Sequence, residues 1–170
     1  TAANSGIVKT FPASATDFTF PIGVGTDYTP VRTNLTANSA TGTITAKVFN
    51  ERHPLTTSAS DLEILRYWTL ENTGLAGATT TLEFTYVDGD IQGTEGSYFG
   101  GIVSAADWSP AGGTEFDDAP TNTVRTVDAA SNTITFSGAS TIAGEYTAGE
   151  TAEFSAVDTY FSRNAGSGGN

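Results

Sequence analysis

The stretch YVDGDIQGTEG, residues 86–96, places three carboxylates and three glycines within eleven residues, directly after a strand-like segment. Asp88, Asp90 and Gln92 carry side-chain oxygens at alternate positions, and Gly93 follows them. Calcium-binding loops of the EF-hand type begin in this way, with ligands at the first, third and fifth positions and a glycine at the sixth. The stretch is therefore either a solvated acidic turn or a structural calcium site.

The resemblance to an EF-hand loop then stops. Its twelfth position is Phe99 instead of a bidentate glutamate, and no flanking helix is expected, although Glu95 could substitute. Calcium takes roughly 6–8 oxygen ligands, so another segment, such as EFDDAP at 115–120, would have to contribute. The predicted structural calcium ligands are Asp88, Asp90, Gln92 and Glu95. The alternative is a solvated acidic turn.

A second candidate site is an aromatic platform for a glycan. Trp108 lies in a loop rich in glycine and proline, AADWSPAGGTEF, and Tyr98 and Phe99 are the other aromatic candidates. Aromatic rings with one apolar face and one wet edge suit stacking on a ligand. The competing interpretation is that Trp108 plugs the end of the fold, because tryptophan is highly buried on average.

No catalytic constellation is evident from the sequence. His53 is the only histidine, there is no cysteine and no G-x-S-x-G motif, so neither a zinc centre of several histidines nor a serine hydrolase is predicted. A glycosidase needs two carboxylates across a cleft, which spacing alone does not place. We predict that the protein is not an enzyme and that His53 belongs to a polar loop following a strand that ends near Phe49.

The elements that would position these residues are strands. Short segments with alternating apolar residues recur between Gly, Asn, Asp and Pro turns, and no window shows sustained helical periodicity. The predicted strands lie within 6–11, 17–23, 28–36, 42–50, 62–70, 80–88, 98–104, 122–127, 132–138 and 150–161. About ten short strands predict an all-β, two-sheet antiparallel β-sandwich, Ig-like or jelly-roll-like, with little or no helix.

Alternation also predicts the core. The inward residues are expected to be Ile44, Ala46, Val48, Leu82, Phe84 and Tyr86. Tyr67 and Trp68 are expected on opposite faces of one strand, one in the core and one at the surface. Pro30 is expected at the edge of the sheet or at a strand start, because proline cannot donate to the ladder, and 128–133 is expected to be a hairpin loop.

Composition limits the partners. The chain has 170 residues, a formal net charge of −12 and only seven Lys and Arg residues, so binding to nucleic acid or to an anionic membrane surface is disfavoured. No apolar run approaches the roughly 20 residues that span a bilayer. We expect a single sandwich domain over 1–161, followed by a Gly-, Ser- and Asn-rich linker over 162–170.

Three segments in order, DFTFPIGVGTDYTPV (17–31), LRYWTLENTG (65–74) and LEFTYVDGDIQGTEGSY (82–98), with IAGEYTAGE (142–150) as a looser fourth, carry a family resemblance. They resemble a β-sandwich module of large secreted and surface-attached proteins of Bacteroidetes-type bacteria, commonly delivered by type IX secretion. The resemblance implies a secreted, cell-surface location and carries no catalytic residue.

The predicted function is a non-catalytic structural or adhesive module that acts as a spacer, a display domain or a self-assembling surface or filament subunit. Its predicted partners are proteins, through self-assembly or through neighbouring domains. The segment TAANSGIVKTF (1–11) is a candidate strand for donation to a neighbour. The alternative function is a carbohydrate-binding module.

Overall fold

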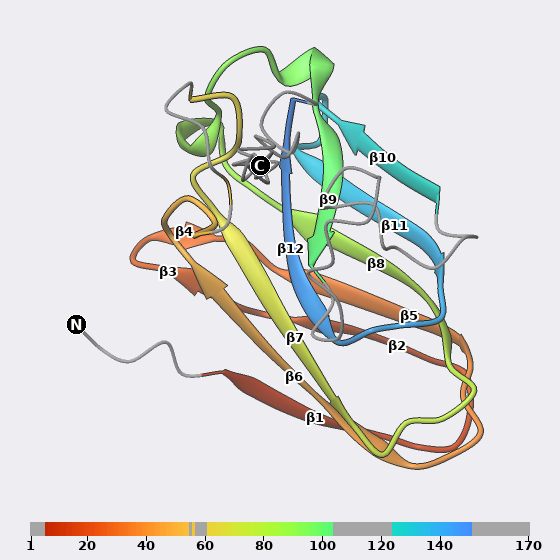
Figure 1. The fold of residues 1–170 in the computed structure, drawn as a ribbon. Helices are drawn as coiled ribbons and strands as arrows, with labels where there is room; N and C mark the ends of the chain where they lie inside the picture. Colours follow the sequence, from red (N-terminus) through yellow and green to blue (C-terminus); the bar gives the residue numbers. More distant parts are fainter. Residues whose placement is uncertain (1–5, 55, 57–60, 104–123, 151–170) are drawn as a thin grey trace, which may run out of the picture.

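Two five-stranded antiparallel sheets packed face to face form the fold in the computed structural model, which describes residues 6–54, 56, 61–103 and 124–150 (Figure 1). Sheet A has the order β1 (Ile7–Phe11), β6 (Gly42–Phe49), β7 (Tyr67–Thr73), β12 (Gly144–Gly149) and β9 (Phe99–Val103). Sheet B has the order β10 (Val124–Asp128), β11 (Thr133–Ala139), β8 (Thr79–Thr85), β5 (Val31–Ala37) and β2 (Thr16–Phe20). The smaller elements are the hairpin of β3 (Gly23–Val24) and β4 (Asp27–Tyr28) and the 3-10 turns η1 (Asp88–Asp90) and η2 (Glu95–Ser97). The predicted β-sandwich is confirmed.

The core lies between the two sheets, where alternate side chains of every large strand meet. All six residues predicted to face inward are at most 5% exposed, namely Ile44, Ala46, Val48, Leu82, Phe84 and Tyr86. Phe84 stands at the centre, with its ring centroid 5.3 Å from that of Trp68 on the opposite sheet and 4.6 Å from that of Tyr146. Each such aromatic pair contributes about 0.5–1.5 kcal/mol beyond the area that it buries.

Two further predictions are confirmed, the strand start at Pro30 and the hairpin loop at 128–133. β5 begins directly after Pro30, where the missing amide hydrogen costs no ladder bond. β10 and β11 form a hairpin whose last pair is Asp128 and Thr133, so the segment between these two residues is the expected hairpin loop.

Two expectations about the elements differ from the structure, and two others lie outside the described residues. The predicted strand at 62–70 begins only at Tyr67, and before it only Glu63 makes an isolated bridge, to Gly149. β12 was not expected as a strand, although it lies between β7 and β9 in sheet A. The predicted strand at 150–161 falls outside the described residues except for Glu150. The expected linker at 162–170 also falls outside them.

Tyr67 and Trp68 occupy opposite faces as expected, but the prediction that one of them is exposed is wrong. Trp68 is fully buried between the sheets, and Tyr67 on the outer face of sheet A is only 7% exposed. The ring of Tyr67 stacks on Phe49 at 4.5 Å and meets His53 edge-on at 4.9 Å. Residues that follow β6 therefore cover this part of the sheet.

Within the described residues, no helix has both the length and the apolar character that a membrane span requires.

Candidate functional site

The sequence-predicted acidic turn lies at one end of the sandwich, and a buried arginine organises it. Arg66 precedes β7 and is 0% exposed, and Asp90, the last residue of η1, is 3% exposed. Arg66 donates from Nε to Asp90 Oδ2 at 2.6 Å and from Nη2 to Asp90 Oδ1 at 2.9 Å, which is a bidentate pair. Two parallel charge-assisted bonds of this kind fix geometry as well as charge.

The same guanidinium joins three further elements. Its Nη2 donates to Asp27 Oδ2 of β4 at 3.0 Å and to Asn50 Oδ1 after β6 at 3.1 Å, and Nη1 donates to Thr29 Oγ1 at 3.4 Å. Asp90 Oδ2 also accepts the backbone amide of Val87 at 3.1 Å. A buried charge is tolerated only when its hydrogen-bonding capacity is met, and here Arg66 meets it while it connects loops from both sheets.

The remaining predicted calcium ligands point toward separate partners. Asp88 Oδ1 accepts from Asn132 Nδ2 at 2.6 Å, and Glu95 Oε1 accepts from the Tyr86 hydroxyl at 2.7 Å. The backbone of Gln92 is hydrogen-bonded to Tyr98: its amide donates to the Tyr98 hydroxyl, and its carbonyl accepts from that hydroxyl. Burial, and then the hydrogen bond to Glu95, raise the pKa of Tyr86. The part of the chain that the structure describes holds no group of three or more His, Asp or Glu residues arranged for a metal ion.

An open, largely polar pocket of about 590 Å³ lies beside three of the Arg66 partners, Asp27, Asn50 and Asp90. It is bordered by Asp27, Asn50, Tyr86, Val87, Asp88, Gly89, Asp90 and Asn132. Asp27 is the accessible carboxylate among the Arg66 partners, with 36% of its side chain exposed. Calcium binding by Asp88 and its neighbours stays a prediction. Two nearby carboxylates, Asp27 and Asp90, already form ion pairs with the Arg66 guanidinium.

Of the predicted glycan platform, the structure describes Tyr98 and Phe99. Tyr98 is 8% exposed, and its hydroxyl is hydrogen-bonded to the Gln92 backbone, so it offers no free face to a ligand. Phe99 is half-buried at the start of β9. Trp108 lies outside the described residues.

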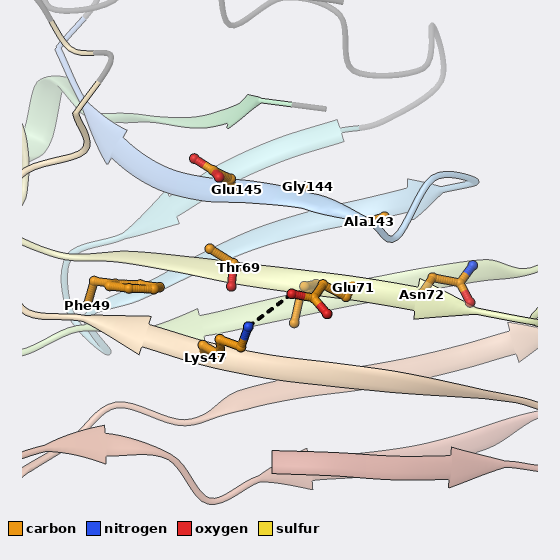
Figure 2. Close-up of a pocket in the computed structure, with 9 residues that line it drawn as sticks. Lys47, Phe49, Thr69, Glu71, Asn72, Ala143, Gly144 and Glu145 are labelled. Carbon is orange, nitrogen blue, oxygen red and sulfur yellow. Dashed lines mark hydrogen bonds and ion pairs between the residues drawn. The ribbon is translucent and has the colours of Figure 1, made fainter. Parts of the chain in front are cut away.

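A groove of about 460 Å³ runs over the outer face of sheet A (Figure 2). It lies where β12 begins at Gly144, opposite Leu70, so that the end of β7 from Glu71 to Thr73 has no partner from β12. The groove is lined by Lys47, Phe49, Thr69, Leu70, Glu71, Asn72, Ala143, Gly144 and Glu145. Lys47 Nζ and Glu71 Oε1 form an ion pair at 3.0 Å across β6 and β7, as the dashed line in Figure 2 marks.

His53 contacts the groove residue Glu145. It is 1% exposed, and its Nε2 lies 2.6 Å from Glu145 Oε2. Burial lowers the pKa of His53, while the hydrogen bond to Glu145 opposes the shift. The polar-loop prediction placed His53 correctly after β6 but missed its burial.

Sequence reasoning missed Arg66, although a signal was present. Ile64, Arg66, Trp68 and Leu70 alternate, and all four are at most 2% exposed. An arginine at an inward position of such a run indicates a buried carboxylate partner.

No protein-family model, curated protein or solved structure matches this chain. The site's chemistry therefore has to be argued from its own geometry. In the described residues, each buried Asp, Glu, Arg or His side chain has an ionisable partner of the opposite type: Arg66 has Asp90 and the more exposed Asp27, His53 has Glu145, and Glu63 has Arg52 at 3.1 Å.

Proposed function

We propose that this chain is a non-catalytic architectural module of a secreted, cell-surface bacterial protein of the kind that it resembles. Its contacts are with other proteins, either neighbouring domains or further copies of itself. The single observation that carries the proposal is the Arg66 cluster, in which a fully buried guanidinium uses its hydrogen bonds to join β4, η1 and the start of β7. These buried hydrogen bonds and ion pairs stabilise the end of the sandwich rather than forming a reaction centre.

Two further features support this proposal. Asp88 and Glu95 are engaged by Asn132 and Tyr86, so the acidic turn also serves the fold. The net charge of −12 keeps an extracellular module soluble and discourages nucleic acid and anionic lipid.

The test combines turnover and assembly. Purified protein is offered glycoside, ester and peptide substrates, and it is then concentrated and imaged by negative-stain electron microscopy. We expect no turnover and a concentration-dependent population of assembled particles. Turnover that depends on Glu145 or Asp27 would contradict the non-catalytic assignment, and single particles at every concentration would contradict self-assembly.

A carbohydrate-binding module is the second candidate, and the sheet A groove favours it. Phe49 supplies an aromatic ring beside hydrogen-bonding side chains of Thr69, Asn72 and Glu145, a combination suited to sugar recognition. On a glycan array, Phe49→Ala is expected to abolish any retention that the wild type shows. Tyr28→Ala, which removes a 60% exposed ring outside the groove, is the matched control and is expected to leave retention unchanged.

A further inference from the structure

The sequence contains a single Asp-Gly pair, Asp88–Gly89, and no Asn-Gly pair. In an Asp-Gly pair the aspartyl side chain is open to attack by the next backbone nitrogen, because glycine has no Cβ to hinder the approach and its backbone adopts many conformations. The pair lies in η1, the turn that ends at Asp90. Its chemistry therefore affects the position of the carboxylate that Arg66 binds.

Both residues of the pair are exposed to water. Asp88 and Gly89 border the open polar pocket, and a Cβ added to Gly89 would meet nothing within 4 Å. The turn is closed by the amide of Asp90, which donates to the Val87 carbonyl at 2.9 Å, and by that of Ile91, which donates to the Asp88 carbonyl at 3.2 Å. Among the described residues, the Gly89 amide donates no hydrogen bond. The attacking nitrogen is therefore unengaged, and water reaches the site.

The reaction that these two residues can undergo has two steps. In the first, the Gly89 nitrogen forms a bond to Cγ of the protonated Asp88 carboxyl group, and one water leaves with the carboxyl hydroxyl and the amide proton. In the second, water adds to the resulting cyclic imide. Hydrolysis at Cγ restores aspartate. Hydrolysis at the main-chain carbonyl carbon of Asp88 instead leaves the chain running through Cβ and Cγ, which is an isoaspartate with a free α-carboxylate, and nothing is oxidised or reduced.

The closed form of η1 restrains this reaction. The five-membered ring needs a different ψ at Asp88 from the roughly −20 to −30° of a 3-10 turn, so η1 has to open before the Gly89 nitrogen can reach Cγ. Asp90 is 3% exposed and is fixed at the end of the turn by its two bonds from Arg66, at 2.6 and 2.9 Å. Asp88 is held by one side-chain bond, from Asn132 Nδ2 at 2.6 Å. The ion pair therefore keeps the reactive atoms apart.

We propose that Asp88–Gly89 is a site of isoaspartate formation and that the Arg66–Asp90 ion pair sets its rate by holding η1 closed. The product in turn weakens this ion pair. An isoaspartate adds one main-chain carbon immediately before Gly89, or about 1.5 Å of chain, whereas the two Arg66 bonds to the next residue, Asp90, are 2.6 and 2.9 Å long. Molecules that have reacted therefore lose the bidentate contact that protected them.

The experiment measures isoaspartate at residue 88 as purified protein ages at neutral pH. Peptide mapping by mass spectrometry with electron-transfer fragmentation distinguishes isoaspartate from aspartate, and the cyclic imide is lighter by one water. The wild type is expected to accumulate isoaspartate slowly, and folded Arg66→Met at least about tenfold faster, because loss of the buried ion pair frees the turn. Gly89→Ala should accumulate it at least about tenfold more slowly than the wild type, since the added Cβ hinders the attack.

Two controls separate the turn from global stability. Gly100→Ala places its Cβ 2.7 Å from the Phe136 ring, in β9 rather than in η1, and should age at the wild-type rate. In concentrated urea the turn is lost, so the wild type and Arg66→Met should age at the same rate. Circular dichroism monitors folding, and Arg66→Lys replaces Arg66→Met if the latter does not fold.

The outcomes decide both parts of the proposal. Folded Arg66→Met that forms no isoaspartate at residue 88 would overturn the modification site. Equal rates in the folded wild type and Arg66→Met, or a Gly100→Ala sample that ages as fast as Arg66→Met, would overturn the protective role of the ion pair.

Discussion

Replacing Arg66 with methionine would remove the charge that holds the end of the sandwich together. The methionine side chain retains much of the volume, but Asp90, 3% exposed, then keeps a buried carboxylate without its bidentate partner. Breaking a buried ion pair by removing one partner costs about 3–5 kcal/mol. A total stability of about 5–15 kcal/mol makes this a large fraction of the free energy of unfolding.

Urea unfolding followed by tryptophan fluorescence in a Trp108→Phe background is the appropriate assay, because the remaining Trp68 is fully buried and donates to the Thr29 carbonyl at 3.1 Å. We expect Arg66→Met to lower the free energy of unfolding by about 3–5 kcal/mol, and the melting temperature by roughly 6–20 °C at 2–4 °C per kcal/mol. The stability of Arg66→Lys should fall between those of the wild type and Arg66→Met, because an ammonium cannot make two parallel hydrogen bonds to the Asp90 carboxylate.

The double variant Arg66→Met/Asp90→Leu provides the decisive control. Replacing both charges by apolar groups removes the unpaired carboxylate, so the double variant is expected to be more stable than Arg66→Met alone. A loss below about 1 kcal/mol for Arg66→Met, or losses that simply add in the double variant, would refute the argument that this pair anchors the fold.

Three other outcomes follow from the structure. Burial lowers the pKa of His53 below its usual 6.5, so the unfolded chain takes up the proton first and the free energy of unfolding should fall as the pH drops through about 6.5. The urea midpoint of His53→Gln should lack this fall. An identical dependence of the midpoint on pH in the wild type and the variant would contradict the role of His53. Chelation by EDTA should leave the melting temperature unchanged if Asp88 serves Asn132 rather than calcium, and a clear fall would instead establish the predicted structural calcium. Gly100→Ala should lower the free energy of unfolding in urea by about 1–3 kcal/mol, since the added Cβ would lie 2.7 Å from the Phe136 ring. The control is Gly89→Ala, whose added Cβ meets nothing within 4 Å and which should change the free energy of unfolding little.

The sandwich could be predicted because apolar residues alternate clearly in several strands, as they do from Ile44 to Val48 and from Leu82 to Tyr86. β12 escaped because its inward positions include Gly144 and Ala148, which carry too little apolar signal to mark a strand. The expectation that either Tyr67 or Trp68 is exposed was wrong because the burial of Tyr67 depends on His53 and Phe49, which contact its ring through tertiary packing.

The acidic turn shows a similar limit. Alternating oxygens at Asp88 and Asp90 carry the same pattern whether a metal or a guanidinium neutralises them. The partner, Arg66, lies 24 residues away from Asp90 in sequence. Only its inward position in an apolar run pointed to a buried partner, and nothing local in residues 86–96 could identify it.

The place of β12 in sheet A has a consequence for biogenesis. This strand is the last one in the described chain, yet it fills the gap between β7 and β9. Until residues 144–149 are available, β9 lacks its neighbour in the sheet. Truncations before β12 should therefore leave sheet A incomplete and be recognised by chaperones or degraded.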